Sequence, residues 1–344
     1  MRATTYDEVV SGRLNHPERR YQQAAQLAYS ALSAHETKRH LIGAVLFGSA
    51  IAHDLFTPPE ANPLSDLDLI VISKDDGTPK VTDALREMSE QIFDKTAVST
   101  EVTWLTEPEA IAGHTLTTPM LAWLRRRTSR HPDTVIGENP ADIIEPLEID
   151  HRSLIEAWIS RTTHNLKKSY VSNRSETLSM ALSIPHITAR KSLDALQFIR
   201  YRYESLTAPT VKIPSSFEVS RDGVTRAVHD IYGAHNPSIS ELYTTVAGAK
   251  SNYIAFLMEE VACHKVSKAE YERAIQNMTR DIAPKSLDLL GGMQDAFLDI
   301  SEVYRHPTAF ASPNSAQLSS LTERLAGYTL VVDGYRSSGW SSAF

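Results

Sequence analysis

Two hydrophobic periods alternate along the first part of the chain. Apolar residues recur at helical spacing in 20–39, whereas 41–49 is a short apolar run, ended by Gly-Ser, that is typical of a buried strand. Residues 66–73 predict a second strand, 81–96 an amphipathic helix, and 97–106, rich in β-branched residues, a third strand. This βα alternation predicts a small mixed sheet flanked by helices.

The pattern becomes helical after about residue 147. Before that point we expect a short helix at 50–56, a proline-containing loop at 57–65, a mostly helical stretch at 107–130 and a short strand with a glycine turn at 132–140. The later helices are predicted at 150–171, 174–204, 216–232, 238–264, 267–281, 285–305 and 314–327, and a last strand signal lies at 328–335. The predicted fold class is α+β, with a sheet domain over 1–146 followed by an all-α domain over 147–344.

Composition narrows the class of protein. A chain of 344 residues exceeds the usual single-domain size, so two domains are expected. A net charge of −7 argues against a dedicated duplex nucleic-acid binder, although it leaves room for a local basic groove. With Cys263 as its one cysteine, the chain cannot form an internal disulfide. The polar N-terminus and the lack of a long apolar run predict a cytoplasmic protein without a membrane segment.

Acidic residues interrupt the predicted strands at two places. Asp66 and Asp68 are two positions apart, so in a strand their side chains share a face, opposite to Leu67 and Leu69. Two ionised carboxylates placed in this way repel each other unless a cation neutralises them, and Mg²⁺ is the hard cation that prefers oxygen ligands. Glu101 on the next predicted strand is a candidate third ligand, and two metal ions would account for all three acids.

A Gly-Ser pair follows the first predicted strand directly. Gly48 and Ser49 would present backbone N–H groups and a hydroxyl at a strand-to-helix turn, which favours phosphate. Gly-Ser or Asp-x-Asp alone is a weak signal, since an acidic strand end is also typical of a solvated sheet edge, and the alternative for Glu101 is a surface residue on a half-exposed strand. Together and in this order they predict a site for a metal and a triphosphate.

These residues resemble the signature of the polymerase-β-like nucleotidyltransferase superfamily. Its members have an apolar strand, Gly-Ser, a short helix, an Asp-x-Asp strand and a third acid on a later strand, which residues 45–50, 65–72 and 99–105 match in order. Residues 132–140 look like the last strand and Gly-x-x-Pro turn of the antibiotic (aminoglycoside-type) nucleotidyltransferases, which also carry a helical C-terminal domain. The stretch Ala50–Ser65 is several residues longer than the family usually has.

The resemblance implies a reaction and roles for residues. The expected enzyme transfers a nucleoside monophosphate from an NTP, ATP above all, to an acceptor hydroxyl and releases pyrophosphate. Asp66 and Asp68 would bind two Mg²⁺ ions, Glu101 would bind the ion that activates the acceptor, and Gly48 and Ser49 would hold the triphosphate. Similar enzymes place a basic residue of a C-terminal helix on the phosphates, and Arg190 and Lys191 are the candidates here.

Several alternatives remain open at the level of sequence. A small-molecule acceptor such as an antibiotic is favoured, because an acidic protein attracts cationic molecules. A local excess of eight Lys and Arg over two acids in residues 160–202 gives weak support to an RNA or protein acceptor instead, as in toxins. The basic run at 124–130 is a second candidate nucleic-acid contact. A non-catalytic NTP-binding regulator is the remaining reading. Glu148, Asp150 and Glu156 are weak candidates for a general base, and the oligomeric state is open.

Overall fold

The computed structural model describes most of the chain. The described residues are 4–47, 66–74, 78–111, 121, 124–125, 128–129, 132–145, 151–202, 211–214, 221–304 and 329–332. The predicted helices at 50–56 and 314–327 and the predicted loop at 57–65 lie outside them, as do Gly48 and Ser49. Among these residues, no helix combines the length and the apolar composition that a membrane-spanning segment needs.

The chain divides into two compact units, each assembled from two stretches of sequence. The sheet unit comprises Arg13–Glu148 and Ser320–Phe344, and the helical unit comprises Met1–Gly12 and Ile149–Ser319. The division after Glu148 is two residues beyond the predicted boundary at 146. The two ends of the chain are assigned differently from the sequence-based division. Met1–Gly12 belong to the helical unit, and Ser320–Phe344 belong to the sheet unit.

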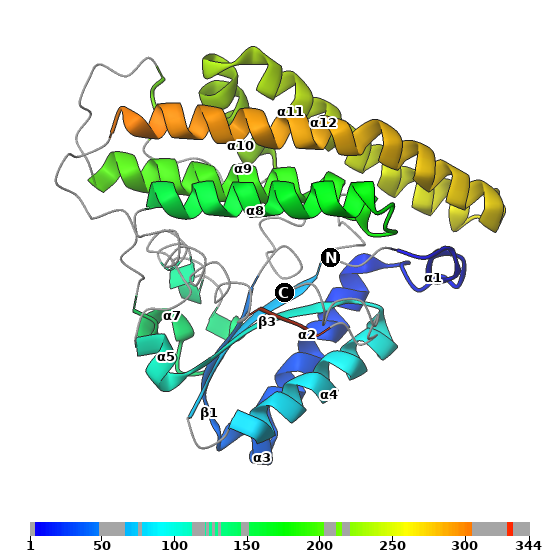
Figure 1. Ribbon diagram of the computed structural model, residues 1–344. Coiled ribbons are helices and arrows are strands. Elements are labelled where there is room, and N and C mark those ends of the chain that lie inside the picture. Colours follow the sequence, from blue (N-terminus) through cyan, green and yellow to red (C-terminus); the bar gives the residue numbers. More distant parts are fainter. Residues whose placement is uncertain are drawn as a thin grey trace. The chain divides into compact units, whose positions relative to one another are not determined.

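The sheet unit contains a mixed sheet and the helices that cover it (Figure 1). Its strands are β1 (Leu41–Phe47), β2 (Leu67–Ser73), β3 (Thr100–Thr106), β4 (Val135–Gly137) and β5 (Thr329–Val332). Its helices are α2 (Pro17–Ser33), α3 (His35–Lys38), α4 (Thr78–Thr96), α5 (Glu107–Ile111) and α7 (Pro140–Ile143), with a 3₁₀ turn, η2, at Pro132–Thr134. The small mixed sheet with many helices agrees with the predicted α+β class.

The order of strands in the sheet is β4-β1-β2-β3-β5. Strand β2 is therefore central, antiparallel to β1 and parallel to β3. The outer pairs, β1 with β4 and β3 with β5, are antiparallel. Because the parallel pair needs a crossover, α4 connects β2 to β3, as the sequence pattern predicted.

Alternate residues of the strands serve two different hydrophobic layers. Leu67, Leu69 and Val71 of β2 pack with the buried residues of α2 and α4 on one face, and these two helices lie side by side there (Figure 1). Ile70 and Ile72 point to the other face, where they pack with residues of α5 and α7. The strand is apolar on both faces because helices cover both.

The predicted helix over 20–39 is interrupted. Helix α2 ends at Ser33 and the short α3 begins at His35, because Ala34 has an extended backbone with ψ of 138°. Helical spacing of alanines and leucines did not reveal this break, since Ala34 is itself a good helix former.

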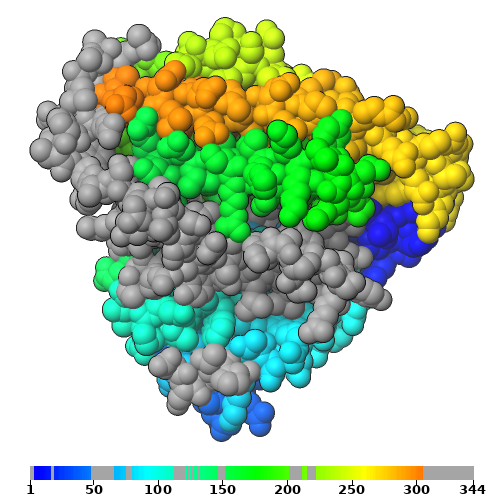
Figure 2. All heavy atoms as spheres, viewed as in Figure 1, coloured from blue at the N-terminus to red at the C-terminus, as the bar shows by residue number. Residues whose placement is uncertain are grey.

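The helical unit is built mainly from long helices, which are α8 (His151–Val171), α9 (Thr177–Arg202), α11 (Pro237–Ala255) and α12 (Lys268–Glu302). It also contains the short helices α1 (Tyr6–Val10) and α10 (Arg221–Ala227) and the π-helical turns η3 (Val228–Gly233) and η4 (Phe256–Val261). Figure 2 shows α8, in green, beside α12, in orange, on one face of this unit. Their buried sides enclose one apolar core around Tyr232, Leu196 and Phe297.

The prediction of separate helices at 267–281 and 285–305 was wrong, because α12 is one helix over this region. It runs without interruption through Pro284, a residue that costs about 3 kcal/mol inside a helix. Packing against α9 holds both halves in place: Ile282 and Ala283 are buried, and the Ser286 hydroxyl donates to the Ala181 carbonyl at 2.8 Å. A tertiary contact of this kind is not visible in the spacing of residues along one helix.

Candidate functional site

The paired acids of the sequence lie at the beginning of the two central strands. Asp68 is the second residue of β2, and Asp66 immediately precedes that strand. Glu101 is the second residue of β3, and in the parallel register its direct partner is Asp68. Neighbouring strands are about 4.8 Å apart, so direct partners on the same face are close neighbours. The register thus brings Glu101 alongside Asp68, as expected for acids on adjacent strands.

The acids occupy the same sheet face as the α5 and α7 layer. Along β2 the residues of this face are Asp68, Ile70 and Ile72, and the last two are buried. Asp68 and Glu101 are half-buried, at the opposite end of the face from Ile72 and its partner Leu105. The face therefore changes from apolar to acidic along two strands in register.

The end of β1 completes this row of residues. Phe47, the last residue of β1, pairs with Asp68, so the row runs Phe47, Asp68, Glu101 across three strands. Gly48 and Ser49 follow Phe47 directly in the sequence but lie outside the described residues. Their predicted role in holding phosphate stays a prediction.

The donor chemistry of the pair fits a hard divalent cation. Two carboxylates in direct register on one face supply the oxygen ligands that Mg²⁺ takes, and a cation would remove their mutual repulsion. Across the described ranges, no group of three or more His, Cys, Asp or Glu side chains is arranged to hold a metal ion. The strand register thus shows that Asp68 and Glu101 are direct neighbours. The predicted site in which all three acids hold metal stays a prediction.

Comparison with known proteins adds no relative. A scan against protein-family models gives no match for this chain, and a search of curated proteins gives no significant match either. Any inference about function therefore rests on the residues and the register described above.

Two arginines of the sheet unit bind the end of α4, and one of them, Arg20, also binds the turn that enters β3. Arg20 of α2 is buried, and its guanidinium donates to the carbonyls of Thr96 at 2.6 Å and Ala97 at 2.9 Å. Arg13 donates to the carbonyls of Phe93 and Asp94, at 3.2 and 3.3 Å. Burial lowers the pKa of Arg20 from its usual value, because desolvation disfavours the charged form. Neither arginine stands out in the sequence, since a basic residue before or within a helix carries no local signal of the group that it binds.

Lys191, a candidate phosphate ligand, is engaged within the helical unit. Its ammonium lies 3.6 Å from the centre of the Trp158 ring, which brings α9 against α8. A cation over an aromatic face gains about 0.5–2 kcal/mol, so Lys191 has a structural partner in Trp158. Arg190 is half-buried on the same helix. The predicted contact of Arg190 and Lys191 with phosphate stays a prediction, and Trp158 is a neighbour that the sequence did not indicate.

The basic stretch at 160–202 is not uniformly exposed. Lys167, Lys168, Arg174 and Arg200 are exposed, and Arg174 makes an ion pair with Glu176 at 3.7 Å, whereas Arg161, Arg190 and Lys191 are half-buried. Of the general-base candidates, Glu156 is half-buried on α8, while Glu148 and Asp150 lie outside the described residues.

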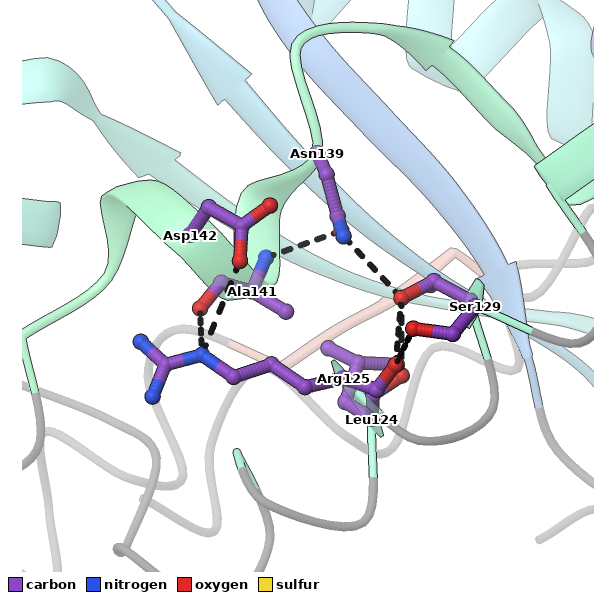
Figure 3. A network of polar contacts seen from close by, with 7 residues as sticks. Leu124, Arg125, Ser129, Asn139, Ala141 and Asp142 are labelled. Carbon is purple, nitrogen blue, oxygen red and sulfur yellow. Dashed lines mark hydrogen bonds and ion pairs between the residues drawn. The ribbon is translucent and has the colours of Figure 1, made fainter.

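The basic run at 124–130 contains an arginine that stabilises the fold (Figure 3). Arg125 donates from Nε to the Ala141 carbonyl at 2.8 Å and lies 3.6 Å from a carboxylate oxygen of Asp142. Both partners belong to α7, so Arg125 connects this run to the short helix after β4. The other arginines of the run lie outside the described residues.

Proposed function

We propose that the chain is a Mg²⁺-dependent nucleotidyltransferase with the fold of the polymerase-β-like superfamily in its sheet unit. The observation that carries the proposal is the direct pairing of Asp68 with Glu101 on the two central, parallel strands. The acid pair stands beside the end of β1, from which the Gly48-Ser49 motif continues in the sequence. The order of motifs along the chain and the order of strands support the same site.

The proposed reaction transfers a nucleoside monophosphate. The oxygen of an acceptor hydroxyl attacks the α-phosphorus of the NTP, the bond between this phosphorus and the bridging oxygen breaks, and pyrophosphate leaves while a base takes the hydroxyl proton. Asp66, Asp68 and Glu101 would hold two Mg²⁺ ions, and ATP is the expected NTP. When bound, the ions neutralise phosphate charge and make the hydroxyl more acidic.

Other groups of the chain would orient the nucleotide. Gly48 and Ser49 would donate hydrogen bonds to the triphosphate, and Arg190 or Lys191 would add positive charge. Lys191 would have to leave the Trp158 ring or contact phosphate from that position. The apolar residues Ile70 and Ile72, further along the same face of β2, anchor this strand by packing with residues of α5 and α7. A cytoplasmic location, where NTPs and Mg²⁺ are present, belongs to this proposal.

The favoured acceptor is a small cationic molecule such as an aminoglycoside-type antibiotic. The net charge of −7 supports this choice, because an acidic protein concentrates cations near its surface. Exposed Lys167, Lys168 and Arg200 give some support to RNA or protein acceptors instead. A regulator that binds NTP without turnover is the third reading.

A label-transfer experiment distinguishes these readings. Purified protein is incubated with Mg²⁺ and each α-labelled NTP, together with aminoglycosides, tRNA or a protein mixture, and the labelled product is identified by mass. The proposal predicts transfer to a small molecule by the wild type and loss of transfer in Asp68→Asn. Transfer to tRNA or protein overturns the choice of acceptor, and unchanged transfer in Asp68→Asn overturns the site. Nucleotide binding without transfer to any acceptor favours the regulator.

A further inference from the structure

The connection from α4 to β3 is short and has an unusual backbone. Helix α4 ends at Thr96, and β3 begins at Thr100, so only three residues separate them. Ala97, the first of these residues, has a positive φ of 53°. A residue with a Cβ rarely adopts this left-handed conformation unless its surroundings hold it there.

Arg20 holds this turn from the buried side. Its Nε and Nη2 atoms donate to the consecutive carbonyls of Thr96 and Ala97, at 2.6 and 2.9 Å. The side chain is 8% exposed, and its guanidinium lies 5.9 Å from the ring centre of Tyr21. A planar guanidinium holds its N–H donors in a fixed geometry, so it restrains both carbonyls at once more tightly than the freely rotating ammonium of a lysine would.

Two further hydrogen bonds connect the restrained turn to the acid pair. The Val98 N–H donates to the Thr96 hydroxyl at 3.2 Å, and the Leu67 N–H donates to the Ser99 carbonyl at 2.8 Å. Leu67 is the residue between Asp66 and Asp68 in the sequence. The hydrogen bond between Leu67 and Ser99, at the end of the turn, therefore helps to align β3 with β2.

Alignment matters here because side chains alternate between the two faces of a strand. A slip of β3 by one residue relative to β2 would place Thr100 or Val102 opposite Asp68 and move Glu101 out of register. Any contact that fixes the conformation of residues 96–99 therefore helps to determine which residue of β3 lies beside Asp68.

We propose that Arg20 is a positioning residue that holds Glu101 in register with Asp68 for metal binding. The inference rests on the proposed function, since it assigns a purpose to the alignment of the two acids. It adds a residue that contacts neither metal nor substrate and that acts through the backbone of the 96–99 turn.

Arg13 provides a matched control. It donates to the carbonyls of Phe93 and Asp94 in the last turn of α4, and its guanidinium lies 5.3 Å from the Phe93 ring centre. Arg13 and Arg20 thus share residue type, unit and target helix. Only Arg20 donates to Ala97, the residue with the positive φ, so general support of α4 and control of the turn can be separated.

The test measures Mn²⁺ binding and backbone protection in the full-length chain. Free Mn²⁺ is counted by electron paramagnetic resonance during titration of the wild type, Arg20→Met, Arg20→Lys, Arg13→Met and Asp68→Asn. We expect Arg20→Met to weaken Mn²⁺ binding about tenfold, Arg20→Lys to recover part of this loss, and Arg13→Met to bind as the wild type does. Hydrogen exchange should show about tenfold faster exchange at the Leu67 amide in Arg20→Met, while α4 outside its last turn stays protected.

The outcomes separate this inference from the proposed function. If Asp68→Asn weakens Mn²⁺ binding and both Arg20 variants bind like the wild type, the positioning role is wrong and the metal site stands. If Arg20→Met and Arg13→Met weaken binding equally, the effect is general support of α4 and the inference also fails. If the wild type and Asp68→Asn bind Mn²⁺ equally, the metal site itself fails, and the inference fails with it. Arg20→Lys supplies the comparison if Arg20→Met does not fold.

Discussion

Asp68 and Glu101 are direct partners in the parallel register of β2 and β3. Both are half-buried and share the face that Ile70 and Ile72 line further along β2. Like charges directly opposite each other repel in a sheet, and a bound cation would relieve this repulsion. Such a pair is typical of a site that evolved for binding, because stability and function frequently conflict at functional positions.

Substitution of Glu101 should therefore affect the metal-free and metal-bound protein in opposite ways. Glu101→Gln removes one charge of the pair, and we expect the free energy of unfolding without metal to rise by about 0.5 kcal/mol. Millimolar Mg²⁺ should raise the melting temperature of the wild type, since a ligand that binds the folded state stabilises it, and should leave that of Glu101→Gln unchanged. Differential scanning fluorimetry measures both effects. Glu90→Gln, exposed on α4, is the control and should respond to Mg²⁺ as the wild type does.

Close contact between two backbones makes Gly43 irreplaceable in β1. A Cβ at this position would lie 1.8 Å from the Glu138 carbonyl oxygen, an atom that cannot move away as a flexible side chain would. We expect Gly43→Ala to lower the free energy of unfolding by about 3 kcal/mol, through disruption of the β1–β4 pairing. Gly248→Ala in α11 has open space around the new methyl group and should be stabilising by about 0.5–1 kcal/mol. Urea denaturation measures the unfolding free energy of both variants. Equal changes in Gly43→Ala and Gly248→Ala would contradict this contact.

Asn139 connects two segments of the sheet unit. Its side-chain oxygen accepts from the Ala141 N–H at 3.1 Å as the cap of α7 (Figure 3), and its amide donates to the Thr128 hydroxyl at 3.0 Å. Loss of both bonds in Asn139→Ala should cost about 1–2 kcal/mol of unfolding free energy. Asn139→Asp retains the cap and loses the donor to Thr128, so it should lie between the wild type and Asn139→Ala. Chemical denaturation that ranks Asp below Ala would contradict this arrangement.

Tyr232 makes a buried hydrogen bond in the helical unit. Its hydroxyl donates to the Ser192 hydroxyl at 2.6 Å, and we expect Tyr232→Phe to cost about 1 kcal/mol of unfolding free energy at neutral pH. Tyr29→Phe is the control, because Tyr29 is 50% exposed and should change stability by less than about 0.5 kcal/mol. Urea denaturation at pH 7 measures both.

The same tyrosine predicts a dependence of stability on alkaline pH. Burial raises the pKa of Tyr232 above its usual value, so the folded state holds the phenolic proton more tightly than the unfolded state does. Its contribution is complete below about pH 10, the usual tyrosine pKa, and is lost at higher pH at about 1.4 kcal/mol per pH unit. The stability difference between the wild type and Tyr232→Phe should therefore shrink between pH 10 and 11. A difference that stays constant would show that Tyr232 is not deeply buried.

The sequence predicted the elements of the sheet better than their connections. Apolar runs and alternation predicted strands at 41–49, 66–73 and 97–106, and strands lie at 41–47, 67–73 and 100–106. The shared face of the acids follows from the two-residue period of a strand. The register that pairs Asp68 with Glu101 is a tertiary property, set in part by the Leu67–Ser99 hydrogen bond. No pattern within a single strand contains this information.

Long-range side-chain contacts were equally invisible in the sequence. Arg20 contacts the end of a helix more than seventy positions later in the chain, and Lys191 lies over Trp158 of another helix. The predicted helix end near Pro284 was wrong, because packing of α12 on α9 outweighs the local tendency of proline to end a helix. Each of these features depends on how separate elements pack, which local propensity does not determine.

The most direct test of the central claim is a double-mutant cycle on metal affinity. Mn²⁺ dissociation constants are measured for the wild type, Asp68→Asn, Glu101→Gln and the double variant. If both carboxylates bind one ion, each single change should weaken binding at least about tenfold, and the double variant should be little weaker than either, because the shared ion is already lost. Wild-type affinity in both single variants, or effects that add independently, would show that Asp68 and Glu101 do not form a common metal site.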